Sequence, residues 1–370
     1  QGASVLDAFL GMLTGSRGED VDEARKKVSE FLVEVAKNDT RRSALEAQYD
    51  RWVELTHSAD RVTWATAIMV LAHLSLDDHN CPRLMQSLAK IRLDPASPDT
   101  LIQLGQAMLL GNLPRNDADA TALGENALVV DTLVAYVRDH EDDRLRHLAC
   151  AALRNLSLPV PNKRIMLARG LMADFLRLMK ESINAPVLFE SIRSVKSLLQ
   201  EEAAHAVFFE HDGLGSLVYI DGKEFQDSQE RVLLEAGRVW AHLAVHDASV
   251  PKLCADGKAS FANPLGRLLA SPFAILQGEA ARALRICYSH PQGARLVPTN
   301  AELTLCDQLS KLVAATNDVN VRSLAVRALA AMLREEVNAV TAAARPSFAH
   351  TDLVGALGVC SFPEEIQEEK

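Results

Sequence analysis

The sequence predicts an all-α fold, an armadillo-repeat solenoid wound as a right-handed superhelix. Two observations carry this prediction: the composition favours helix over sheet, and one helix-end motif recurs at a nearly constant spacing. Hydrophobic residues make up 48% of the 370 residues, but aromatic residues make up only 5%. Alanine and leucine therefore dominate the apolar set, and both residue types favour helices.

The clearest copy of the motif is the segment 142–163, an amphipathic helix that ends in Ala-Leu-Arg-Asn-Leu-Ser before a proline turn. When helix ends are aligned on Asn155, successive matches are 39, 39, 43, 42, 45, 44 and 46 residues apart. This spacing is typical of armadillo or HEAT repeats. The aligned anchor positions are Glu34, His73, Asn112, Asn155, Ser197, His242, Ile286 and Met332.

A second sequence pattern, a glycine or asparagine at a nearly fixed distance after an anchor, favours armadillo over HEAT repeats. Four anchors are followed, 14 to 16 residues later, by a glycine or asparagine and then by an apolar helix. These residue types readily adopt the left-handed conformation at a sharp corner between helices, and HEAT units usually lack such a corner. The four corner positions are Asn126, Gly170, Gly213 and Gly257.

No long linker or change of composition interrupts this pattern, so we expect one continuous array of about eight repeats over residues 1–344. Residues 345–370 are expected to hold one short helix, over 352–358, and an acidic tail. The chain begins at Gln1 rather than methionine, so its N-terminus is expected to be a cut.

Charge and cysteine usage restrict the partners. The net charge is −10 and the pI is about 5.6, which argues against nucleic acid and favours a basic protein segment. The six cysteines are scattered without a CxxC pair, which predicts reduced, buried thiols in a cytoplasmic protein. No secretion or membrane-spanning segment is expected, and we expect a monomer without membrane insertion.

The sequence contains no GxxxxGK[ST], HExxH or GxSxG motif. The histidines form no pair that suggests a metal, because His73, His242, His246 and His290 fall at equivalent places of different repeats. We therefore expect no enzyme activity, no metal and no cofactor.

Polar residues on the inner helices are the candidate functional residues. The anchors and the positions four residues away share one helix face. This face is expected to be acidic and amide-rich in the early repeats and basic in the later ones, where three arginines each precede an anchor by four residues. A solvated helix surface would explain it, but so would a bipolar groove that orients a partner. The residues are Glu30, Glu34, Asn38, His73, Asp77, Asn112, Asn116, Arg193, Arg238 and Arg282.

Three asparagines stand out on this face. Asn112 and Asn116 are expected one turn apart, and Asn155 continues the row in the next repeat. An asparagine amide both donates and accepts hydrogen bonds, so it can pair with a partner's backbone. Each one alone could be a local cap of a helix end; as a row, we interpret them as groove ligands.

These segments resemble a known family. The run NLPRND over 112–117, the run ALRNL over 152–156 and the run PVPNK over 159–163 resemble motifs of the small-G-protein GDP-dissociation stimulators. That family has Asn-Phe-Ala-Arg-Asn-Asp one repeat before Ala-Leu-Arg-Asn-Leu-x-x-Pro-Val-x-Asn-Lys. The likeness is expected to continue weakly from about Glu30 to the C-terminus.

The resemblance implies an armadillo protein that binds Rho- or Ras-type GTPases with polybasic, prenylatable C-termini, as chaperone and stimulator of nucleotide exchange. The GTPase is expected on the concave groove, and its polybasic tail on the acidic end. The implied GTPase-binding residues are Asn112, Asn116 and Asn155, and the helix-face pattern adds His73, Asp77, Arg193 and Arg238 to the predicted GTPase-binding residues. The implied tail-binding residues are Glu30, Glu34, Asn38 and Asp39.

Two departures and two alternatives accompany this interpretation. Family members have further N-terminal repeats, and Pro114 is expected to shorten its helix end; both departures bear on exchange activity more than on binding. One alternative is a peptide-binding adaptor of the importin or catenin kind, although Trp52, Trp64 and Trp240 do not precede asparagines at a fixed offset. The other is a HEAT-like scaffold without a dedicated ligand.

Overall fold

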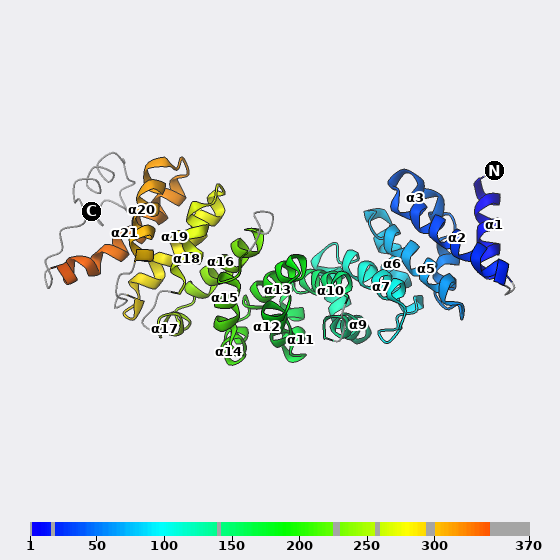
Figure 1. Cartoon of the computed structure of the whole chain (residues 1–370), viewed down its shortest axis with the longest axis horizontal. Helices are drawn as coiled ribbons and strands as arrows, with labels where there is room; N and C mark the ends of the chain where they lie inside the picture. Colours follow the sequence, from blue (N-terminus) through cyan, green and yellow to red (C-terminus); the bar gives the residue numbers. More distant parts are fainter. Residues whose placement is uncertain are drawn as a thin grey trace. The chain divides into compact units, whose positions relative to one another are not determined.

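The computed structural model describes residues 2–15, 19–138, 142–224, 230–255, 260–293 and 300–340. Every regular element in these ranges is a helix (Figure 1), which confirms the predicted all-α class. The expected helix over 352–358, the acidic tail, Cys360 and the predicted corner Gly257 lie outside the described residues.

The chain forms two compact units. Unit 1 comprises Gln1–Leu178 and Pro186–Glu201, and unit 2 comprises Met179–Ala185 and Glu202–Lys370. Each unit consists of stacked helices; one continuous array over 1–344 stays a prediction.

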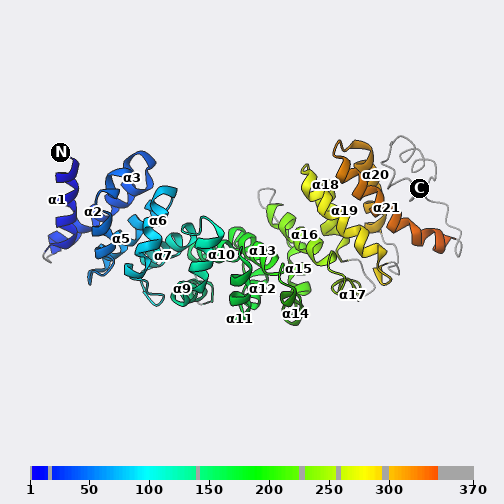
Figure 2. The same ribbon diagram turned by 180° about the vertical axis from the view of Figure 1, so that it is seen from behind.

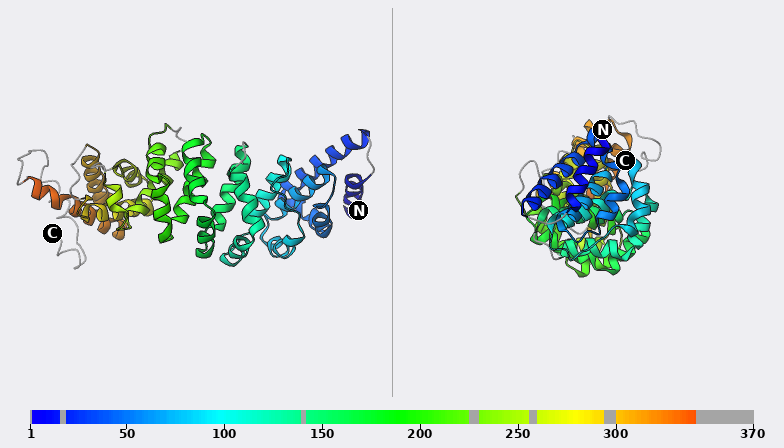
Figure 3. Two further views of the ribbon diagram at one scale, coloured as in Figure 1. Left: turned by 90° about the horizontal axis from the view of Figure 1, so that it is seen from below. Right: turned by 90° about the vertical axis from the view of Figure 1, so that its right-hand side faces the viewer.

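Unit 1 holds the helices numbered up to α13, which lie side by side in sequence order (Figures 2 and 3). They are α1 (Gly2–Thr14), α2 (Glu19–Lys37), α3 (Asp39–Glu46), α4 (Tyr49–Leu55), α5 (Arg61–Leu74), η1 (Asp78–Asn80), α6 (Cys81–Ser87), η2 (Leu88–Lys90), α7 (Thr100–Asn112), α8 (Asp117–Glu125), α9 (Ala127–Arg138), α10 (Asp143–Leu156), α11 (Val160–Ala168), most of α12 (Leu171–Glu181) and most of α13 (Ala185–Leu198).

Unit 2 holds the remaining helices. They are α14 (Glu202–Glu210), α15 (Gly213–Asp221), α16 (Glu230–Ala244), α17 (Val250–Leu253), α18 (Ala262–Ala270), α19 (Ala274–Ser289), α20 (Asn300–Ala315) and α21 (Val319–Val340).

The predicted repeat register is confirmed within each unit. Every anchor position lies on a long helix, and all but Met332 lie within its last four residues. In unit 1, α2 packs on α5, α5 on α7 and α7 on α10; in unit 2, α16 packs on α19 and α19 on α21. The anchor helices are α2, α5, α7, α10, α13, α16, α19 and α21.

The long helices form the core because their apolar residues recur every three to four positions. In α10 the side chains of Leu145, Ala149, Cys150 and Leu153 are buried, and Asp142 caps the first turn by accepting a hydrogen bond from the Arg144 amide. Full burial of a leucine side chain contributes roughly 1.5–3 kcal/mol. Repeated over each anchor helix, this burial stabilises the stack.

The predicted corners are partly confirmed. Gly170 adopts a φ of +78° between α11 and α12, as predicted. Before α15, the left-handed residue is Asp212, with a φ of 55°, rather than Gly213. Gly213 serves close packing instead, because a Cβ there would lie 2.4 Å from the Phe208 ring. Asn126 is also wrong as a left-handed corner: its φ is −78°, and its side chain caps α9 at the Leu128 amide.

Five cysteines are free and buried, which confirms the buried-thiol prediction for these residues: Cys81, Cys150, Cys254, Cys287 and Cys306. Among the described residues, no single helix is long and apolar enough to cross a membrane. Helices α8 and α9 pass such a test only as a pair, and they meet at 83°.

Candidate functional site

The implied GTPase-binding residues of unit 1 lie where the anchor helices end. These residues differ in burial: Asn116 is exposed, whereas Asp77, Asn112 and Asn155 are half-buried. His73 is only 7% exposed. The hydrogen bonds of the less exposed residues run mainly to neighbouring repeats, as the following contacts show.

The ends of α5 and α7 are joined by two side chains. Asn112 donates from Nδ2 to Ser75 Oγ at 3.1 Å. Arg115 donates from Nη2 to the carbonyl oxygens of Ser75, at 2.6 Å, and Leu76, at 3.2 Å. Carbonyl groups at a helix C-terminus lack partners within the helix, and a guanidinium satisfies them well.

The same arrangement recurs in the next two repeats. Asn155 of α10 donates from Nδ2 to the Gly111 carbonyl oxygen of α7 at 3.2 Å. Ser197 of α13 donates to the Ser157 carbonyl oxygen at 3.1 Å, and the two hydroxyl oxygens are 2.8 Å apart. We call these contacts, with the Asn112–Ser75 bond, the inter-repeat brace. The asparagine row is thus a structural link between repeats, which the sequence interpretation as groove ligands missed.

Asn116 does not share the face of Asn112, contrary to the prediction. Helix α7 ends at Asn112, and Asn116 is the N-cap of α8, where its Oδ1 accepts a hydrogen bond from the Asp119 amide at 2.9 Å. The reason is Pro114, which has no backbone N–H to continue the hydrogen bonding of α7; Leu113 before it still adopts the helical conformation. The predicted shortening at Pro114 is therefore confirmed.

Asp77 forms a link between the first two repeats of unit 1. It accepts a hydrogen bond from Arg42 Nη1 at 2.8 Å, and Arg42 also contacts Asp39 Oδ1 at 2.5 Å and the Ala36 carbonyl oxygen at 2.8 Å. The Arg42 side chain is only 2% exposed, whereas that of Asp77 is 32% exposed. A buried guanidinium needs such partners, because desolvating an unpaired charge is costly.

His73 is wrong as an exposed groove residue. Its Nδ1 donates to the Met69 carbonyl oxygen at 2.7 Å, within α5. Burial, aided by the positive charges of Arg42 and Lys37, lowers the pKa of the imidazole. The folded state therefore favours a neutral ring at this position.

The implied tail-binding residues form an exposed acidic surface at the end of α2 and the start of α3. Glu30 and Glu34 lie one turn apart on α2, and Glu34 pairs with Lys37 at 2.5 Å. Asn38 caps α3 by accepting from the amides of Thr40 and Arg41. The Asp39 side chain is 88% exposed. We call Glu30, Glu34, Asn38 and Asp39 the acidic surface.

Two of the three arginines at the predicted basic end have their charges balanced by glutamates, whereas Arg282 is exposed. Arg193, in unit 1, pairs with Glu190 at 3.1 Å. Arg238, in unit 2, pairs with Glu235 at 3.0 Å and with both carboxylate oxygens of Glu279 on α19, at 2.9 Å each. The prediction considered the arginines without the glutamate three residues before each.

The run PVPNK over 159–163, part of the family resemblance, also stabilises the structure. Asn162 is fully buried and donates to the carbonyl oxygens of Ala120, at 2.6 Å, and Leu156, at 2.8 Å. Lys163 donates to the Leu158 carbonyl oxygen at 2.9 Å, and burial lowers its pKa. These residues fix α11 against the end of α10.

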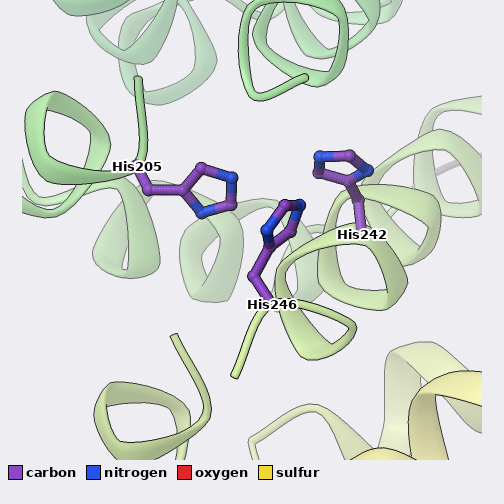
Figure 4. Close-up of side chains that lie close together, drawn as sticks. All are labelled: His205, His242 and His246. Carbon is purple, nitrogen blue, oxygen red and sulfur yellow. The ribbon is translucent and has the colours of Figure 1, made fainter. Parts of the chain in front are cut away.

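The sequence analysis also missed a group of histidines in unit 2. The rings of His205, His242 and His246 come together between α14 and the end of α16 (Figure 4), contrary to the expectation that no histidine pair suggests a metal. The spacing of four residues between His242 and His246 was visible in the sequence, but His205 is 37 residues earlier.

Comparisons with known proteins agree with this architecture. No protein-family model matches the chain. It is 22% identical to an engineered protein of known crystal structure, with a TM-score of 0.64 over 98% of this chain and 96% of that one. A designed armadillo repeat protein is 19% identical, with a TM-score of 0.53 over 68% of this chain and 99% of that one. The fold therefore defines an all-α armadillo-repeat solenoid.

The sequence relatives are more specific. The chain is 27% identical over 187 residues to Rap1 GTPase-GDP dissociation stimulator 1-A of Xenopus laevis, and equally to stimulator 1-B of the same organism. Each alignment covers 50% of this chain and 30% of the relative. The aligned share of this chain is smaller than predicted, because the likeness was expected from about Glu30 to the C-terminus. The chain thus spans under a third of the length of these relatives. Its predicted resemblance to the GDP-dissociation stimulators is confirmed.

Proposed function

We propose that this chain binds small GTPases of the Rho or Ras type and stimulates their release of GDP. The observation that carries the proposal is the similarity to the two Rap1 GTPase-GDP dissociation stimulators. The armadillo fold supports it, because repeat arrays present extended surfaces to protein partners. The chain would act as a regulator without catalytic chemistry of its own.

The acidic surface is the proposed contact for a polybasic GTPase tail. Glu30, Glu34 and Asp39 are exposed, and exposed carboxylates attract a basic segment over roughly a Debye length, about 8 Å at physiological salt. The net charge of −10 adds to this attraction. Exposed Phe31 lies between the two glutamates on α2 and offers an apolar contact beside them.

The proposed contact for the GTPase body is the exposed side of the helix ends of unit 1. Asn116 is exposed there, and Leu76 and Leu158 expose 46% and 50% of their surface. Asn112 and Asn155 would act mainly by holding these ends in register, and Asp77 by fixing Arg42. Arg193 and Arg238 remain proposed contacts, but with a weaker contribution to binding, because their charges are balanced by glutamates.

The proposed mechanism is selective binding of the nucleotide-free GTPase. A binder shifts an equilibrium only by its difference in affinity between the two states. A tenfold preference for the nucleotide-free form corresponds to about 1.4 kcal/mol. We also propose that the chain acts as a chaperone for prenylatable GTPases, as a cytoplasmic monomer, without nucleic-acid or membrane partners.

One binding experiment tests the proposal against its alternatives. Rap and Rho proteins, each nucleotide-free, GDP-loaded or GTP-loaded, are presented to the immobilised chain. We expect the nucleotide-free forms to be retained most strongly. Equal retention of all forms would indicate an adaptor for the basic tail, and no retention would contradict the proposal.

A further inference from the structure

Three imidazole rings converge in unit 2 (Figure 4). The ring centroids of His205 and His246 are 4.1 Å apart, those of His242 and His246 are 5.0 Å apart, and those of His205 and His242 are 5.9 Å apart. One ring nitrogen of each residue lies within 4.8 Å of the other two. All three side chains are half-buried, so they are held in place but reachable from solvent.

Two adjoining segments supply these rings. His205 lies on α14, and His242 lies in the last turn of α16. His246 follows in a turn in which its amide bonds to the Leu243 carbonyl oxygen at 3.2 Å. The turn brings the His246 ring beside that of His242, with the ring centroids 5.0 Å apart. The same spacing of four residues lets two histidines of one helix bind zinc.

A hydrogen bond orients one of the rings. His205 Nδ1 lies 3.1 Å from the hydroxyl oxygen of Ser249, a residue that is only 1% exposed. Metal-ligating histidines usually donate their second ring N–H to a hydrogen-bond acceptor, which fixes the orientation and tautomer of the ring.

We propose that His205, His242 and His246 bind one divalent transition-metal ion of the zinc class, with a fourth position for water or a partner's side chain. Imidazole is a favoured ligand for these ions, and three histidines with an open position form a known tetrahedral arrangement. Bonds of 2.0–2.1 Å place tetrahedral nitrogens about 3.3 Å apart, so modest rotations of the half-buried rings would close the site.

Two buried thiols of unit 2 are poor competing ligands for the ion. Burial raises the pKa of the Cys254 thiol to about 11 and that of Cys287 still higher, and only a thiolate binds zinc well. The ion would link α14 to the end of α16. This site goes beyond the proposed GTPase function, although Arg238 lies one turn before His242 on the same helix.

The test is calorimetric titration of the chelator-treated full chain with Zn²⁺, without any GTPase present. We expect one ion per chain and a higher thermal midpoint with zinc. His205→Gln, His242→Gln and His246→Gln should each lose this binding, and Ser249→Ala should weaken it about tenfold. His211→Gln, which replaces an exposed histidine of the same unit, should bind like the parent chain.

Absence of Zn²⁺ binding to the parent chain would overturn the proposal, as would binding that survives all three substitutions. A second measurement uses the parent chain alone, so its result does not depend on whether the variants fold. Co²⁺ added to the parent chain should give the intense visible absorption of a tetrahedral site, and Zn²⁺ should abolish it. A spectrum like that of aqueous Co²⁺ would contradict the proposed site.

Discussion

The side-chain amide of Asn155 donates a hydrogen bond to the Gly111 carbonyl oxygen at 3.2 Å, and so joins the ends of two successive repeats. The Asn155 Oδ1 is engaged as well, because it accepts from Arg154 Nη1 at 2.9 Å. This asparagine lies in the run ALRNL over 152–156, which resembles a motif of the GDP-dissociation stimulators. Its first role is to set the spacing of the helix ends on which a partner would dock.

Asn155→Ala is expected to destabilise unit 1 by about 1–2 kcal/mol, because it removes the donor and leaves the Gly111 carbonyl oxygen without this bond. Urea unfolding of the full chain, followed by circular dichroism, measures the effect. Gln86→Ala, which truncates an exposed amide on α6, should stay within about 0.5 kcal/mol of the parent chain. Equal stability of all three chains would refute the structural role of Asn155.

The Arg42–Asp77 pair is expected to couple the first two repeats of unit 1. A double-mutant cycle with Arg42→Leu and Asp77→Ala should give a coupling energy of about 1 kcal/mol. This is below the value for a fully buried pair, because Asp77 is about a third exposed and partly screened by solvent. A coupling energy near zero would show that Asp77 is available for a partner instead.

His73 predicts a pH dependence of stability. Burial lowers its pKa in the folded state, while an unfolded histidine titrates near 6.5. The unfolded chain therefore binds the proton first, and the contribution of this group, present above about pH 6.5, is lost as the pH falls toward the lowered pKa. His73→Gln should flatten the dependence of the unfolding free energy on pH below about pH 6.5. If the unfolding free energy of His73→Gln changed with pH as steeply as that of the parent chain, the predicted role of His73 would be disproved.

The repeat architecture was predictable because it depends on a period. Each anchor helix must bury one apolar face against its neighbours, so leucines and alanines recur in register, and the alignment on Asn155 found every anchor helix. Corners were less predictable. Asp212 takes the left-handed conformation with help from its side chain, which accepts from the Gly215 amide and pairs with Lys180.

The candidate site was less predictable, because a helical face shows where a side chain lies but not which distant group it meets. Asn112 and Asn155 bond to groups about 40 residues away. Arg238 is neutralised by Glu279 of the next anchor helix. Glu30 and Glu34 are exposed on one helix as its spacing implies, but Glu34 pairs with Lys37 and Asp39 with Arg42, and tail binding by the acidic surface stays a prediction.

Glu30→Lys is expected to slow association with a GTPase that carries a polybasic tail, by about threefold to tenfold at low salt. The difference should shrink as salt rises, because exposed charges are screened. Asp307→Lys makes the same charge change on α20 in unit 2, at a side chain that is also exposed, and should alter the rate less. Equal effects of both substitutions would indicate that only net charge matters.

The central claim is tested most directly by the rate at which a GTPase releases GDP. Rap or Rho protein loaded with a fluorescent GDP analogue is mixed with the chain in the presence of excess unlabelled GTP. The account predicts faster release with rising concentration of the chain, and a smaller acceleration by Asn155→Ala and Glu30→Lys than by the parent chain. Release at the intrinsic rate at every concentration would contradict it.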